Sequence, residues 1–203
     1  MKKKARIAVL VSGGGTNLQA LLDAEKAGRI PHGEIVLVIA SNESAYALTR
    51  AKNAGVSAHA VCRKGLSQEV FEECISALLE EYAVDLIVLA GFLSILSADF
   101  TKKWPERILN IHPSLSPSFC GQGYYGLTVH EKALEKGVKV TGATVHFVNE
   151  IPDGGRILLQ KAVEVKEGDS PETLQRRVME EAEWILLPQA AEEVSRKIVE
   201  ERG

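Results

Sequence analysis

The sequence predicts an α/β fold in which a mainly parallel sheet is flanked by helices and extended by antiparallel strands in the C-terminal third. Short apolar runs alternate with segments of helical periodicity over the first two thirds of the 203 residues, as in successive βαβ units. After the loop of residues 113–127 and one further helix, two long alternating strand patterns follow each other directly, as antiparallel strands do. Together these patterns indicate a Rossmann-like sheet.

The first half of the chain supplies the alternating units. Residues 34–40 form a near-continuous apolar run, which is typical of a strand covered by helices on both faces. Residues 67–82 place Phe71, Ile75 and Leu79 at helical spacing and so predict a helix with one buried side. Strands are predicted near residues 6–11, 34–40, 58–61 and 85–90, and helices near residues 16–27, 45–53 and 67–82.

The second half supplies the remaining elements. They are predicted as a strand over 107–111, a helix over 128–136, strands over 139–148 and 156–165, and a helix over 170–201. Ser170 is the expected N-cap of the last helix, with Pro171 at its first position. Pro188 is expected to kink or break that helix. Without repeats or low-complexity linkers, the chain is predicted to be a single domain, 1–203.

Composition and charge exclude several classes of protein. A formal net charge of −3 argues against a general nucleic-acid or membrane surface. No apolar segment approaches the ~18 residues that span a bilayer, and no secretion signal is predicted. The cysteines Cys62, Cys74 and Cys120 are odd in number and widely spaced, which indicates neither a disulfide framework nor a metal pair. We expect a cytoplasmic enzyme of small molecules that holds no metal.

An asparagine and a histidine stand two residues apart where an apolar run ends. Asn110 and His112 follow Arg107–Leu109, so in a strand both side chains point to the same face. Open α/β sheets place their ligand sites at the carboxyl ends of strands, and Pro113 ends this strand. A histidine in such a place is more often structural, but the Asn-x-His-Pro context favours chemistry.

A glycine-rich turn joins the first predicted strand to the first helix. Its sequence is Ser12-Gly13-Gly14-Gly15-Thr16-Asn17-Leu18. Glycines permit positive φ, and free N–H groups at a helix start point toward an anion. The turn lacks the Walker lysine and the last glycine of a dinucleotide motif. Two interpretations stay open: a tight turn with a cap, or a cradle for a monophosphate.

A carboxylate lies in the loop that links the two long strands. Asp153 precedes Gly154 and Gly155, whose backbone can approach a site closely. Beside His112, this carboxylate would favour the imidazolium and hold one ring nitrogen; by itself it is an ordinary hairpin aspartate. Asn110 supplies an amide, and no covalent nucleophile is evident, which favours direct acyl transfer in which the acceptor attacks.

The other histidines are expected to be less important. His146 lies in an alternating strand and is predicted to pack beside the site rather than act as its main acid. His32, His59 and His130 are predicted to lie in turns or at the surface. The histidines lack H-E-x-x-H spacing, and the serines lack a G-x-S-x-G elbow.

These motifs resemble, in order and over nearly the whole chain, those of the phosphoribosylglycinamide formyltransferases. The pieces that carry the resemblance are Ser12–Gln19, Leu89–Leu93, Asn110–Ser114, Gly142–Phe147 and Asp153–Gly155. The Asn-x-His-Pro-Ser piece is shared by folate-dependent formyltransferases generally. The N-terminal piece points more narrowly to the enzymes of the purine pathway.

The resemblance implies the formyltransferase fold and a defined reaction: transfer of a formyl group from 10-formyltetrahydrofolate to the amine of glycinamide ribotide in de novo purine biosynthesis. It implies His112 as the general acid/base, Asn110 as a donor to the oxyanion, and Asp153 as the carboxylate that positions the imidazole. Small molecules are the only implied partners of a monomer or homodimer. The phosphate-binding half would be residues 1–105, and the catalytic and folate-binding half 106–203.

The resemblance also implies the binding residues. Those for the ribotide are Gly15, Thr16, Asn17 and Glu183. Those for the folate are Gln68, Leu93, Ser94, Ile95, Leu96, Asn110, Asn149, Glu150, Ile151, Pro152 and Asp153.

The chain departs from the family pattern in three places. Ser94 and Gln68 stand where basic residues are common near the folate, so the folate tail would be bound more weakly or by Arg63 or Lys64. The loop of residues 118–126 is longer than usual. Its three glycines and two tyrosines fit either a cover over the site or an ordinary variant loop.

Alternative functions share this fold. They are a formyl-folate hydrolase, a formyltransferase for another amine substrate, and a non-catalytic nucleotide-binding domain. Hydrolases usually carry an additional N-terminal domain and the enzymes that act on aminoacyl-tRNA a C-terminal barrel, and neither is expected in 203 residues. The complete set of Asn110, His112 and Asp153 argues against the non-catalytic alternative.

Overall fold

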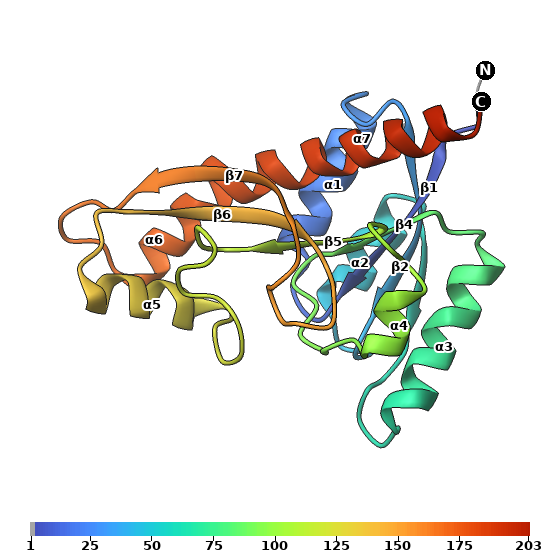
Figure 1. Cartoon of the computed structure of the whole chain (residues 1–203), viewed down its shortest axis with the longest axis horizontal. Helices are drawn as coiled ribbons and strands as arrows, with labels where there is room; N and C mark the ends of the chain where they lie inside the picture. The colour runs from blue at the N-terminus through green and yellow to red at the C-terminus, as the bar shows by residue number, and fades with distance from the viewer. Residues whose placement is uncertain (1–2) are drawn as a thin grey trace.

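The structure is a computed structural model that describes residues 3–203, so Met1 and Lys2 of the predicted domain lie outside it. The described chain forms a seven-stranded sheet in the order β3-β2-β1-β4-β5-β6-β7, flanked by helices (Figure 1). The strands are β1 (Ala5–Val11), β2 (Gly33–Ala40), β3 (Ser57–Ala60), β4 (Leu86–Leu89), β5 (Ile108–His112), β6 (Val140–Phe147) and β7 (Ile157–Glu164). The helices are α1 (Thr16–Lys26), α2 (Tyr46–Asn53), α3 (Gln68–Glu81), α4 (Ala98–Lys102), α5 (Leu127–Lys136), α6 (Pro171–Val178) and α7 (Trp184–Glu201).

The sheet has the predicted mixed topology. The pairs among β1 to β5 are all parallel, whereas β5–β6 and β6–β7 are antiparallel pairs. The chain runs outward from β1 to β2 and β3, then returns to β4 on the other side of β1. Open α/β sheets bind ligands where the strand order reverses in this way. The loops after β1 and β4 therefore border the expected site.

Two apolar cores cover the two faces of the sheet. On one face, the buried side of α1 packs with the long helix α7, which also contacts β1, β2 and β4 to β7. On the other face, Phe71 and Ile75 of α3 pack with Phe100 of α4. Figure 1 shows α5 and α6 together at the end of the molecule formed by β6 and β7, away from α3 and α4. The predicted α/β fold is confirmed.

Two local predictions differ from the structure. The short helix α4, capped by Ser97, was not predicted because five residues are too few for a periodic pattern. Pro188 does not break the last helix, since α7 continues through it. It lies near the start of α7 and removes only the N–H that would reach Trp184, so the other hydrogen bonds hold the helix. The irregular part is instead a π-helical turn, Met179–Glu183, directly before α7.

Candidate active site

The polar face of β5 is built together with β6. Leu109 and Ile111 are buried in the apolar core on the α7 side, so Asn110 and His112 point to the opposite face. The antiparallel register pairs Asn110 with His146 and His112 with Thr144. Four polar side chains therefore share one face of two neighbouring strands, as the alternation of side chains predicts for the first two.

Asp153 contacts the side chains of both Asn110 and His112. Its Oδ2 lies 3.5 Å from His112 Nδ1, and Asn110 Nδ2 lies 3.4 Å from its Oδ1. The Gly121 N–H donates to Asp153 Oδ2 at 2.8 Å. Burial raises the pKa of Asp153, but its contacts with His146, His112 and the Gly121 N–H outweigh burial and hold that pKa below its usual value. An ionised carboxylate beside His112 can orient the ring and stabilise its imidazolium.

His146 lies where the sequence places it, beside the site. Its Nδ1 donates to the Phe147 carbonyl at 2.9 Å. Its Nε2 is 3.2 Å from Asn110 Nδ2 and 3.4 Å from Asp153 Oδ1. A neutral His146 accepts from the amide through Nε2, and a protonated one donates to the carboxylate. In both states it holds the two predicted catalytic side chains from the β6 side.

The loop of residues 118–126 borders the site. The Phe119 carbonyl lies 2.8 Å from His112 Nε2, so this nitrogen carries a proton and donates. Phe119 and Asp153 both adopt positive φ, at 50° and 54°, a conformation that is uncommon for residues other than glycine and that concentrates at functional sites. Residues 121–126 of this loop line the cleft described next, so the loop forms part of its wall.

A cleft of about 530 Å³ opens in front of these groups. Among the predicted folate-binding residues, those that line it are Leu93, Ile95, Asn110, Pro152 and Asp153. Gln68 lies just behind, where its Nε2 donates to the Ile95 carbonyl at 3.0 Å. The remaining predicted folate-binding residues, Ser94, Leu96, Asn149, Glu150 and Ile151, do not line this cleft. Leu96 is buried against the α3 and α4 core, and Asn149 and Glu150 border a separate hollow.

A second cavity, of about 340 Å³, lies beside the glycine turn. All four predicted ribotide-binding residues, Gly15, Thr16, Asn17 and Glu183, line it. Gly15 has φ of 73°, and a Cβ there would lie 2.7 Å from Ala47 Cβ, so a glycine is required. The cavity and the cleft share the lining residues Gly91, Ile111, Pro113 and Gly126. A ligand held at the glycine turn can therefore extend to His112.

Glu183 ends the π-helical turn and is almost fully buried. Its Oε2 accepts a hydrogen bond from Asn17 Nδ2 at 2.6 Å. Burial raises the pKa of Glu183 to about 7, and the hydrogen bond from Asn17 offsets only part of that effect. Buried polar groups and π-helical turns both concentrate at functional sites. The turn had no recognisable signal in the sequence.

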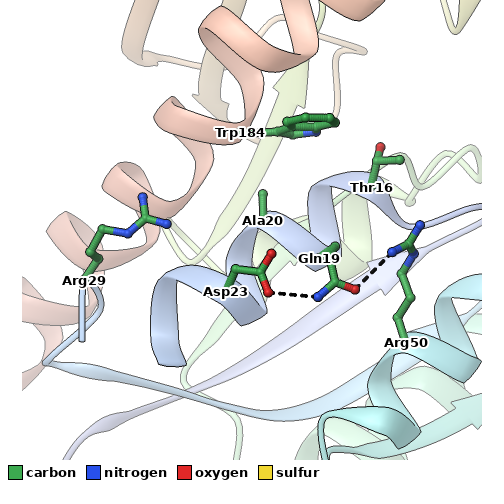
Figure 2. Close-up of a pocket in the computed structure, with 7 residues that line it drawn as sticks. All are labelled: Thr16, Gln19, Ala20, Asp23, Arg29, Arg50 and Trp184. Atoms are coloured by element: carbon green, nitrogen blue, oxygen red, sulfur yellow. Dashed lines mark hydrogen bonds between the residues drawn. The ribbon is translucent and has the colours of Figure 1, made fainter. Parts of the chain in front are cut away.

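Arg50 supports the glycine turn and was not predicted. Its Nε donates to the Gly14 carbonyl at 2.8 Å and its Nη1 to Gln19 Oε1 at 3.0 Å. Figure 2 shows this arginine at the side of α1, where Gln19 also donates to Asp23. The hollow drawn there shares only Thr16 with the cavity, and none of the three predicted catalytic residues lines it. An arginine on the following helix carries no local signal for such a contact.

The sequence predicted that His130 lies in a turn or at the surface, but the structure buries it. It is 0% exposed in α5 and lines the cavity beside the glycine turn. The prediction was wrong because α5 is covered by α6, a contact that no local pattern indicates. His32, by contrast, is partly exposed and pairs with Glu192 at 2.6 Å.

Metal and membrane features are simple to describe. Over residues 3–203, the structure brings together no group of three or more His, Cys, Asp or Glu side chains that could hold a metal ion. None of the helices in that range is long and apolar enough to cross a membrane.

Comparisons with known proteins agree with this geometry. The chain is 45% identical to phosphoribosylglycinamide formyltransferase of Haemophilus influenzae over 90% of this chain and 84% of that protein. It is 46% identical to human trifunctional purine biosynthetic protein adenosine-3 over 96% of this chain, which spans only 19% of that protein. The crystal structure of glycinamide ribonucleotide transformylase 1 from Symbiobacterium toebii superposes with a TM-score of 0.89, at 44% identity and over 96% of this chain and 89% of that one. The family model described as formyl transferase matches residues 5–190, and the chain therefore belongs to the formyl transferase family.

Proposed function

We propose that this protein transfers a formyl group from 10-formyltetrahydrofolate to the amine of glycinamide ribotide, a step of de novo purine biosynthesis. The observation that carries the proposal is the junction of two sites. The cavity at the glycine turn and the cleft at Asn110, His112 and Asp153 share one wall. A phosphorylated amine can be anchored in the first and react in the second. The names of the relatives support the ribotide as the acceptor of the formyl group.

The cavity suits the ribotide. The N-terminus of α1 presents free backbone N–H groups at the turn of Gly13 to Asn17, where a phosphate is stabilised. Glu183 lies deeper, hydrogen-bonded to Asn17, and is a suitable partner for ribose hydroxyls. The amine of the bound ribotide then points toward the shared wall. Over residues 3–203 no lysine or arginine lines the cavity, so the partial positive charges of these N–H groups stabilise the phosphate.

The cleft suits the formyl donor. Phe92, Leu93, Ile95 and Tyr125 give part of its wall an apolar or aromatic character, which fits a planar ring system. Arg63 stands near its outer end, where it donates to Gln68 Oε1 at 3.1 Å. This arginine supplies the positive charge that the tail carboxylates of a folate require and that Gln68 lacks.

The reaction is a direct attack of the acceptor amine on the formyl group. The neutral amine attacks the formyl carbon, a new N–C bond forms, and the carbonyl electron pair moves to oxygen. Asn110 donates to that oxyanion, and protonated His112, whose Nε2–H donates to the Phe119 carbonyl, stabilises it by its positive charge. Asn110 Nδ2 lies 3.4 Å from Asp153 Oδ1, which is long for a hydrogen bond, so this N–H is the one available to the oxyanion. The bond from the formyl carbon to the folate nitrogen then breaks, and a proton passes from the attacking nitrogen to the leaving nitrogen.

A direct assay tests the proposal. The purified chain is mixed with 10-formyltetrahydrofolate and glycinamide ribotide, and the deformylated folate is followed by its absorbance. Formyl transfer that requires the ribotide supports the proposal. Release of folate at the same rate without ribotide would establish a hydrolase instead, and ribotide binding without any turnover would establish a non-catalytic binding domain. A ribotide-independent transfer to a different amine would show another acceptor.

A further inference from the structure

The buried imidazole of His130 has unused hydrogen-bonding capacity. Both of its ring nitrogens are buried without a hydrogen-bond partner anywhere in residues 3–203. Unpaired buried polar atoms are destabilising, and natural proteins keep them chiefly where a function requires them. The same cavity wall holds a second such atom, Asn17 Oδ1. The protein therefore leaves polar atoms unpaired at the place where the proposed substrate binds.

The chemistry of His130 restricts what it can bind. Burial, and then the proximity of His112, lowers the pKa of His130 to about 4, so the ring is neutral near pH 7. A neutral imidazole has one N–H donor and one lone-pair acceptor. One nitrogen therefore suits an acceptor and the other a donor, and a hydroxyl or an amide can serve at either nitrogen. A phosphate dianion supplies only acceptors and is better served by the N–H groups of the glycine turn.

Position distinguishes the hydroxyls from the amide. Glu183 is hydrogen-bonded to Asn17 at the glycine turn, which places the carboxyl near the phosphate and the ribose. His130 lines the cavity together with Pro113 and Gly126, which also line the cleft that contains His112. The part of a ribotide between its ribose and its reacting amine is the glycinamide amide.

We infer that His130 is a specificity-determining residue that hydrogen-bonds the amide of the glycinamide group and so selects an acceptor that carries this amide. The inference rests on the proposed function and adds a recognition element to it. From the glycine turn outward, the phosphate accepts from backbone N–H groups, the ribose hydroxyls contact Glu183, and the amide hydrogen-bonds His130. The amine then lies at Asn110 and His112 in the cleft.

The test compares a ligand that carries the glycinamide group with one that lacks it. Titration calorimetry without folate measures binding of glycinamide ribotide and of ribose 5-phosphate to the wild-type protein and to His130→Leu. Leucine removes both polar atoms at similar volume, which leaves folding unharmed or improved. We expect His130→Leu to bind the ribotide about tenfold more weakly and ribose 5-phosphate equally well. His59→Leu, at a histidine outside both cavities, is the matched control and is expected to bind both ligands normally.

Other outcomes overturn the inference. An equal loss of affinity for both ligands would show that His130 contacts the ribose or maintains the shape of the pocket. Unchanged affinity for both ligands would show that His130 has only a structural role. A measurement on the wild-type protein avoids dependence on folding of the variant: the ring nitrogen resonances of His130 should shift with ribotide and not with ribose 5-phosphate. An equal response to the two ligands contradicts the inference.

Failure of the proposed function would look different. A wild-type chain that neither binds the ribotide nor transfers formyl groups to it refutes both ideas together. A wild-type chain that does both, with His130→Leu behaving identically, refutes only the role of His130.

Discussion

The two halves of the proposed site differ in how their polar groups are satisfied. In the cleft, Asn110, His112 and Asp153 contact one another or nearby backbone. In the cavity, Asn17 Oδ1 and both nitrogens of His130 have no partner in the described chain. The groups of the first site are oriented by one another before any ligand arrives, whereas the second contains buried polar atoms without a partner.

This difference follows from what each site does. Groups that stabilise a transition state must already be oriented, because reorienting them during the reaction costs free energy. Groups that recognise a ground-state ligand can be left unpaired, because the ligand then gains their full hydrogen-bonding capacity. Substitutions of Asn110, His112 or Asp153 in the cleft should therefore lower kcat, and substitutions in the cavity should raise KM.

The largest effect is expected at His112. Glutamine at this position can still donate to the Phe119 carbonyl, which now accepts from His112 Nε2 at 2.8 Å, but it cannot carry a titrating proton. His112→Gln should lower kcat about 1,000-fold because general acid–base catalysis is lost. Steady-state kinetics with both substrates checks this, and calorimetry should show wild-type affinity for the ribotide. A loss confined to KM would contradict the distinction between the two sites.

Removal of the amide at Asn110 should have the next largest effect. Asn110→Ala deletes one proposed donor to the oxyanion, which typically costs ~3 kcal/mol. We expect turnover to fall about 100-fold or more with the thermal unfolding temperature nearly unchanged, since the side chain is not part of the apolar cores. Near-normal turnover of this variant would remove Asn110 from the mechanism.

The sequence predicted the cleft better than the cavity for a physical reason. Asn110 and His112 are placed by the two-residue period of a strand, and Pro113 shows where that strand ends. The approach of Asp153 depends on a hairpin whose Gly155 lies against the Phe147 carbonyl, where a Cβ would be only 1.7 Å from the oxygen. The glycine pair signals such an approach, although the resemblance was needed to connect it with His112.

The cavity depends on contacts between segments that are far apart in sequence. His130 is buried because α6 packs on α5, and nothing near residue 130 signals this. Glu183 was placed at the site only by resemblance, since the π-helical turn before it is not visible as a period. The same limit applies to Arg50, whose contact with the Gly14 carbonyl joins α2 to the turn before α1.

The stability of the cavity should depend on pH through Glu183. Its pKa is raised to about 7 in the folded protein, chiefly by burial, above the ordinary value of 4.5 in the unfolded chain. The protonated form is therefore the stabilising one. Its contribution is complete below pH 4.5 and is lost as the pH rises to about 7, by no more than about 3 kcal/mol.

Glu183→Gln isolates this effect because glutamine stays neutral and its oxygen can still accept from Asn17. Between pH 5 and 8, the free energy of unfolding of the wild type should fall relative to that of the variant. Urea unfolding at several pH values measures the difference. Parallel pH dependence of the two proteins would show that Glu183 is ionised throughout.

The smallest effect is expected at the outer end of the cleft. Arg63 donates to Gln68 and to the Leu66 carbonyl, two uncharged acceptors that leave its positive charge available to a folate tail. Arg63→Met should raise the KM of a polyglutamylated donor about threefold, as for an exposed ion pair, and leave kcat unchanged. Lys64→Met, at the neighbouring residue, is the matched control.

If Lys64→Met raises this KM and Arg63→Met does not, Lys64 is the residue that replaces the missing charge at Gln68. If the KM for a monoglutamate donor rises as much as that for the polyglutamate, Arg63 acts on the cleft itself rather than on the tail.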